Sequence, residues 1–121
     1  MSGISIAKSL ELHLVGSLVT REQVRVGCER AGEAHLASVC VWPAHAALAA
    51  EVLAGSATRV RAAIGFPYGQ DTVELKLAAC DRALADGAHE LAILLDPSVL
   101  DGIASGAADA MRDELERVLQ H

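Results

Sequence analysis

Two stretches decide the fold of this chain, Ala37-Ser38-Val39-Cys40-Val41-Trp42-Pro43 and Ala62-Ala63-Ile64-Gly65-Phe66-Pro67-Tyr68-Gly69. Each is a short apolar run that ends at a proline, and a segment with the pattern of a helix follows it. Continuous small and branched apolar residues are typical of parallel strands that are buried on both faces. The alternation of strand and helix predicts an α/β fold whose chemistry lies in the loops after the strands.

Helix signals flank these two strands. Thr20-Arg-Glu-Gln23 has the pattern of a capping box and predicts a helix to about Gly32. Further helices are expected over 44–54, from 71–74 to Gly87, and over 107–119. A third strand is expected over 90–95. Asp96-Pro97 then predicts a short helix that ends at Gly102 or Gly106.

The segment before the first helix alternates strictly, as Leu10-Glu11-Leu12-His13-Leu14. If it is extended, its leucines lie on one side, and Glu11 and His13 lie on the other. A short strand and the end of a helix both fit this pattern. The element order is therefore β-α-β-α-β-α behind an N-terminal helical segment, which predicts a parallel sheet with right-handed crossovers.

Composition and charge exclude several classes of protein. Apolar residues make up 52% of the 121 residues but aromatic residues only 2%, so the core must consist of Ala, Val, Leu and Ile. The net charge is −6 and no run of Lys or Arg occurs, which argues against nucleic acid or an anionic membrane as a partner. No apolar stretch approaches the roughly 20 residues that span a bilayer. The N-terminus has no signal-peptide pattern either, and we expect a cytoplasmic protein.

Cysteine and histidine spacings predict neither disulfides nor a metal site. The three cysteines are odd in number, which favours free thiols. No Cys-x-x-Cys occurs, and the remaining histidines fall on different elements, at His35, His45, His89 and His121. Because no glycine-rich nucleotide loop follows a strand, we expect no cofactor.

Five motifs follow one another along the chain: Cys28-Glu-Arg-Ala31, Ala37-Ser-Val-Cys-Val-x-Pro43, Ile64-Gly-Phe-Pro-x-Gly69, Glu74-x-Lys76 and Gly87-Ala-x-Glu-Leu91. Their order and spacing resemble, without a gap, the N-terminal half of the deoxyribose-phosphate aldolase family. Members of that family are (β/α)₈ barrels that make and break carbon–carbon bonds through a Schiff base on a lysine. The resemblance implies a partial TIM-type barrel, with three parallel strands and their helices, as one half-barrel domain over residues 1–121.

The chain departs from the family's pattern at chemically important positions. A complete barrel needs about 250 residues. The family's Schiff-base lysine and the lysine that tunes it lie on later strands, which this chain does not contain. Lys8 and Lys76 are the only lysines, and we interpret Lys76, which matches a family lysine, as a surface helix residue. The family's catalytic aspartate falls on Ala92, and its N-terminal Asp-His-Thr or Asp-Leu-Thr signature falls on Glu11-Leu12-His13.

Four residues are candidates for catalysis. Glu11 and His13 form the best acid/base pair, although a solvated edge explains them equally well. Cys40 matches a cysteine of the family, but a nucleophile would need a lowered thiol pKa, and a buried inert thiol is the alternative. Asp96 is an even number of residues from Ala92, so on an extended strand both side chains lie on the same face, and Asp96 is expected at the barrel mouth. Its role there is either that of an acid/base group or that of the helix cap before Pro97.

The chain's three aromatic residues, Trp42, Phe66 and Tyr68, all follow strand ends. They predict a substrate-binding wall that stacks on a flat or sugar-like ligand. Packing under a lid is the alternative.

We therefore expect a shortened relative of the aldolases that binds a small carbonyl or sugar-like substrate. Its chemistry would be acid/base rather than Schiff-base, within a metabolic or biosynthetic pathway. One alternative is a non-catalytic pseudoenzyme or interaction subunit that completes or regulates a partner, and another is the front part of a longer product. Because bare sheet edges tend to be covered, we also expect a homo-oligomer or a partner chain.

Overall fold

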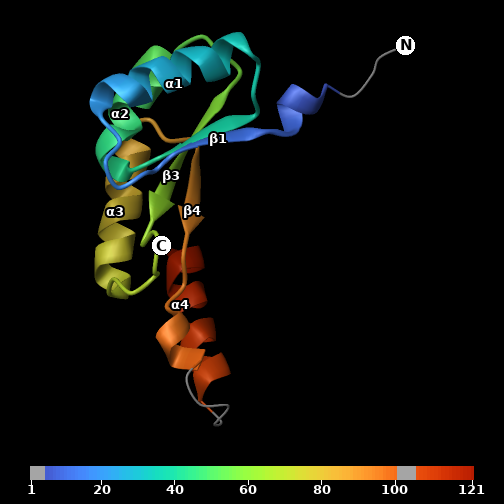
Figure 1. Cartoon of the computed structure of the whole chain (residues 1–121). Helices are drawn as coiled ribbons and strands as arrows, with labels where there is room; N and C mark the ends of the chain where they lie inside the picture. The colour runs from blue at the N-terminus through green and yellow to red at the C-terminus, as the bar shows by residue number, and fades with distance from the viewer. Residues whose placement is uncertain (1–4, 101–105) are drawn as a thin grey trace.

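A computed structural model describes residues 5–100 and 106–121 (Figure 1). The strands are β1 (Glu11–Leu14), β2 (Ser38–Val41), β3 (Arg59–Ile64) and β4 (Glu90–Ile93). The α-helices are α1 (Arg21–Glu33), α2 (Ala46–Val52), α3 (Val73–Ala85) and α4 (Ala107–Gln120). Three short 3₁₀-helices complete the order, namely η1 (Ile6–Ser9), η2 (Pro43–His45) and η3 (Pro97–Leu100).

The four strands form one parallel sheet in the order β1-β2-β3-β4. Each strand therefore pairs with the next one along the chain, across a connection that contains a helix. Helices α1, α2 and α3 pack on one side of the sheet, and α4 follows β4 at its end (Figure 1). This is the predicted partial α/β barrel.

The sheet contains one strand more than the three that were predicted. Residues 11–14 form β1, which pairs in register with β2, so the N-terminal helical segment is only the four-residue η1. The apolar and polar residues that alternate in this segment lie on opposite sides of the strand, as expected for extended backbone. Leu12 and Leu14 pack against the core, which leaves Glu11 and His13 on the other side of the sheet.

Local capping chemistry explains where the helices begin and end. The Oγ1 of Thr20 accepts from the N–H of Gln23, and the Gln23 side chain accepts from the N–H of Thr20, which is the predicted capping box. Helix α3 begins after Thr72, whose Oγ1 accepts from the N–H of Leu75 at 3.3 Å. Gly87, at φ +99°, ends α3 in the left-handed conformation that glycine adopts most easily.

The short helix after Asp96 is confirmed as η3. Of the two residues predicted to end it, Gly102 lies outside the described residues, and Gly106 is the N-cap of α4. No helix in the described parts of the chain is long and apolar enough to cross a membrane.

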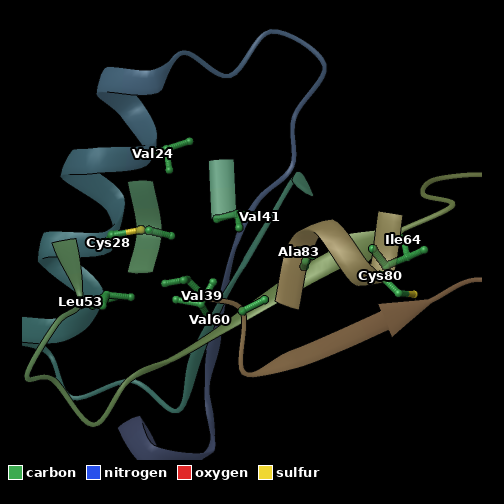
Figure 2. Close-up of a cluster of buried hydrophobic side chains, with 13 residues drawn as sticks. Val24, Cys28, Val39, Val41, Leu53, Val60, Ile64, Cys80 and Ala83 are labelled. Carbon is green, nitrogen blue, oxygen red and sulfur yellow. The ribbon is translucent and has the colours of Figure 1, made fainter. Parts of the chain in front are cut away.

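The core consists of small aliphatic side chains and thiols, as the composition predicts. Figure 2 shows valines of β2 and β3 between Val24 and Cys28 of α1 and the residues of α3. Val39, Val41 and Val60 are fully buried there. Because these side chains are small, the helices pack close to the sheet. The face of the sheet that the helices cover is apolar.

Lys76 is not the surface residue that the sequence pattern suggested. It is 1% exposed, and its Nζ donates to Oε1 of Glu114, which is itself 7% exposed. The other carboxylate oxygen of Glu114 accepts from the N–H of Asp96 at 3.0 Å. The Lys76–Glu114 pair therefore connects α3, α4 and the segment that follows β4.

We predict that Lys76→Met destabilises the fold by about 3–5 kcal/mol, because removal of one partner leaves a buried charge without compensation. The double variant Lys76→Met/Glu114→Gln should recover part of this loss, since glutamine still accepts from Asp96 and carries no charge. Denaturant unfolding measures both effects.

Glu74→Gln is the matched control, because Glu74 joins Arg117 in an exposed ion pair between the same two helices. Its effect should be small. If Lys76→Met unfolds at the same midpoint denaturant concentration as the wild type, the buried pair does not stabilise the fold.

Candidate functional site

The side of the sheet opposite to α1–α3 carries polar residues, and we call it the polar face. Side chains alternate along each strand, so the residues that do not enter the apolar core share this face. The strand residues on this side are Glu11, His13, Ser38, Cys40, Arg59, Arg61, Ala63, Glu90 and Ala92. Strand pairing brings them together across the sheet, with His13 opposite Cys40, Cys40 opposite Arg61, and Arg61 opposite Glu90.

Glu11 is the centre of the polar face. Its Oε1 lies 2.8 Å from Nε2 of His13, and its Oε2 accepts from the hydroxyl of Ser38 and lies 3.2 Å from the guanidinium of Arg61. The Glu11 side chain is 18% exposed, whereas that of His13 is 59% exposed. The Glu11 carboxylate, which Ser38 and Arg61 fix in place, therefore contacts the solvent-accessible imidazole of His13.

Arg61 links Glu11 to Glu90. Its Nη2 lies 2.8 Å from Oε2 of Glu90, and Arg59 binds the other oxygen of the same carboxylate at 2.7 Å. The hydrogen bond to Glu90, with a smaller effect from Glu11, raises the pKa of Arg61. Hydrogen bonds from Arg61 and Arg59 lower the pKa of Glu90. Acidic and basic side chains thus alternate across the face, from Glu11 through Arg61 to Glu90.

Cys40 is a thiol rather than a thiolate in this environment. Burial, together with the nearby Glu11 carboxylate, raises its pKa to about 11, against the opposing effect of Arg61. The lowered pKa that a cysteine nucleophile needs is therefore not present. The sequence left open whether Cys40 is a nucleophile or a buried, inert thiol. Its burial and its raised pKa favour the inert thiol.

Glu11, His13 and Cys40 also form a possible metal-ligand set. One ligand atom from each residue lies within 4.8 Å of the other two. Spacing along the chain concealed this set, because the histidine and the cysteine come from neighbouring strands that are 27 residues apart in register.

Asp96 lies apart from this cluster. Its Oδ1 accepts from the N–H of Ser98 at 2.9 Å at the start of η3, and hydrogen bonds with Ser98 lower the pKa of Asp96. The hollow around it is lined by residues of α3 and α4, among them Asp113 and Arg117. The structure thus supports the cap interpretation of Asp96, and no interaction among the described residues joins it to Glu11 or Cys40.

The aromatic residues are arranged differently from the predicted wall. Trp42 and Phe66 pack edge to face with ring centroids 5.4 Å apart, and the indole N–H of Trp42 donates to the carbonyl of Gly16 at 3.3 Å. Tyr68 is 71% exposed. The loop that carries Phe66 and Tyr68 lies against the end of β4, where a Cβ on Gly69 would come within 2.1 Å of the carbonyl of Leu95.

Sequence reasoning missed Ser38, Arg61 and Glu90 as members of the site. The signal was present in Arg59-Val60-Arg61, where charged residues alternate with an apolar one inside a strand. Charged side chains on alternate positions of a strand indicate a polar face.

Comparison with proteins of known sequence and structure gives one consistent result. A deoxyribose-phosphate aldolase of Caldanaerobacter subterraneus is 33% identical over 117 residues, which are 97% of this chain and 49% of that protein. The chain is a relative of the deoxyribose-phosphate aldolases. It spans about half the length of the curated relatives that it matches. No model of a protein family matches the chain.

Solved structures agree on the fold. An aldolase named QR15 matches with a TM-score of 0.87 and 24% identity, over 98% of this chain and 51% of that one. The deoxyribose phosphate aldolase from Aeropyrum pernix, described as a unique tetramer, matches with a TM-score of 0.83 and 23% identity, over 95% of this chain and 46% of that one.

We predict that acidification weakens the fold through Glu90. The folded-state pKa of Glu90 is below its ordinary value of 4.5, so its ion pairs stabilise the fold above that pH and are lost as the pH falls through the folded-state pKa. Glu90→Gln should therefore show a shallower decline of unfolding free energy below about pH 5. Denaturant unfolding at a series of pH values measures this.

Glu51→Gln serves as the control, since Glu51 makes no ion pair with any described residue. Its acid profile should match that of the wild type. A Glu90→Gln profile as steep as that of the wild type would contradict the role of the Arg59–Glu90–Arg61 network.

Proposed function

We propose that this chain binds a small carbonyl or sugar-like molecule over the polar face and acts on it by acid/base chemistry. The proposal rests on the pair of Glu11 and His13, in which Nε2 of His13 lies 2.8 Å from Oε1 of Glu11. The imidazole is largely exposed, and the carboxylate is mostly buried. Histidine titrates near neutrality, and a carboxylate partner orients its ring.

In this proposal, His13 removes a proton from the carbon next to a carbonyl group. Nε2 of His13 faces Glu11, which leaves Nδ1 to receive the proton from the substrate. Glu11 stabilises the imidazolium that forms. Arg61, whose side chain is 38% exposed, stands next to this pair as the group that would stabilise negative charge on the carbonyl oxygen.

The lysines of this chain support acid/base rather than imine chemistry. Lys76 belongs to α3 and is buried in its pair with Glu114 of α4. Lys8 belongs to η1, before the first strand. A Schiff base needs an amine that reaches the carbonyl carbon, and neither lysine is among the residues of the polar face.

Hydrogen–deuterium exchange at the carbon next to the carbonyl tests this proposal. We expect the wild-type chain, in D₂O with a chelator present, to exchange the protons of small aldehydes and hydroxyketones faster than buffer does. His13→Gln should slow this exchange by at least about a hundredfold, the lower end of what a general base contributes. Proton NMR follows the exchange directly.

His121→Gln is the matched control, because His121 pairs with Asp81 on the exposed side of α3. Its rate should equal that of the wild type. Exchange at the buffer rate, or exchange that His13→Gln leaves unchanged, would refute the acid/base proposal. A lysine adduct trapped by borohydride would show instead that imine chemistry operates.

A second candidate function is non-catalytic association, with a second copy of this chain as the partner. Two observations support it. Strands β1 and β4 each pair on one side only within the described sheet. An apolar groove of about 570 Å³ runs beside β1 and α1, lined by residues such as Leu12, Leu14 and Val26. Bare edges and apolar grooves are surfaces that proteins usually cover.

We predict that the chain sediments as a dimer or larger species. Val26→Asp should shift the sedimentation profile toward the monomer, because it places a charge in the groove. Leu84→Asp, an exposed position on α3, should not shift it. A single monomeric species at all concentrations would contradict self-association.

The proposed compartment is the cytoplasm. Cys28, Cys40 and Cys80 are all free and buried, which is the pattern of a protein that folds under reducing conditions.

A further inference from the structure

We propose that Glu11, His13 and Cys40 bind a divalent transition-metal ion, and that zinc is the ion that fits these ligands best. Sequence spacing gave no sign of such a site. The fold creates it, because β1 and β2 place His13 directly opposite Cys40, and Glu11 precedes His13 by two residues on the same face. One oxygen, one nitrogen and one sulfur atom then lie within 4.8 Å of one another.

The chemical types of the three ligands select the metal. Calcium and magnesium prefer oxygen ligands alone, whereas zinc accepts thiolate sulfur, imidazole nitrogen and carboxylate oxygen. Bonds of about 2.0–2.3 Å to zinc place neighbouring ligand atoms about 3–4 Å apart. The present separations need only a modest contraction. His13, whose side chain is 59% exposed, has the freedom to make it.

The groups around Glu11 suit a metal ligand. Ser38 and Arg61 both approach Oε2 of the carboxylate, the hydroxyl by a hydrogen bond and the guanidinium at 3.2 Å. These contacts orient the carboxylate. Oε1 faces His13, and the Arg61 guanidinium approaches it only to 3.5 Å, so Oε1 is the oxygen for the ion. Glu90, whose Oε2 lies 2.8 Å from Nη2 of Arg61, offsets the positive charge of Arg61 beside the proposed ion.

Three protein ligands leave a fourth position on a tetrahedral zinc ion. Sites of this kind keep that position for water or for an oxygen of a substrate. Binding converts the Cys40 thiol to a thiolate, whose proton passes to solvent, while the ion gains a sulfur ligand. The expected small-molecule ligand is therefore an oxygen donor such as a carbonyl or a hydroxyl group. Metal binding at these three ligands does not require the chain to be catalytic.

Cobalt(II) absorption spectroscopy tests the site without substrate. We expect the metal-free wild-type chain, titrated with Co²⁺, to develop a thiolate-to-cobalt charge-transfer band and the visible bands of four-coordinate cobalt, and Zn²⁺ to abolish them. Cys40→Ser should remove the charge-transfer band. His13→Gln and Glu11→Gln should weaken Co²⁺ binding by at least about tenfold, as loss of one ligand from a small set implies.

The chain offers matched controls in Cys28→Ser and Cys80→Ser, since both thiols lie on the helix side of the sheet and should leave the band unchanged. His13 is largely exposed, so the fold of His13→Gln does not depend on the site, and circular dichroism verifies it. Absence of a charge-transfer band in the wild type, its persistence in Cys40→Ser, or unchanged affinity in His13→Gln would overturn the proposal. Because proton exchange is measured with a chelator and metal binding without substrate, the two proposals fail separately.

Discussion

The two-residue alternation of side chains on a parallel strand is the constraint from which the rest of this structure follows. One parity of β2 and β3 carries Val39, Val41 and Val60, which must pack against α1–α3 to leave water. The other parity is thereby directed to the opposite side of the sheet. The polar and charged residues of the four strands meet there because the apolar residues occupy the other side. The polar face is thus a consequence of how the core is buried.

Charge is balanced differently in the two parts of the molecule. On the polar face, acids and bases alternate across the strands and remain partly exposed, so solvent limits what each pair contributes to stability. Between α3 and α4, Lys76 and Glu114 are buried, and each depends on the other. The first arrangement leaves groups accessible for chemistry, and the second holds the last helix against the end of the sheet.

The relation to the deoxyribose-phosphate aldolases is shown by the sequence and the fold of this chain. The chain retains the strand and helix order of its relatives over half of their length. Asp96, which strand parity placed at the barrel mouth, instead accepts from the N–H of Ser98 and lies apart from Glu11. The titratable groups that do gather are Glu11, His13 and Cys40, which come from the first two strands. The proposed function therefore uses groups at the β1 edge of the sheet.

The sequence by itself determined the local elements. Apolar runs, the Thr20 cap and the glycines after helices are short-range signals, so the predicted fold class and nearly all element bounds agree with the structure. The strand nature of residues 11–14 was ambiguous, because alternation over five residues fits more than one conformation. Only the tertiary structure decided the burial of Lys76, the separation of Asp96 from the polar face and the meeting of His13 with Cys40. Each of these depends on which distant segments pack together, and spacing along the chain carries no information about the register between strands.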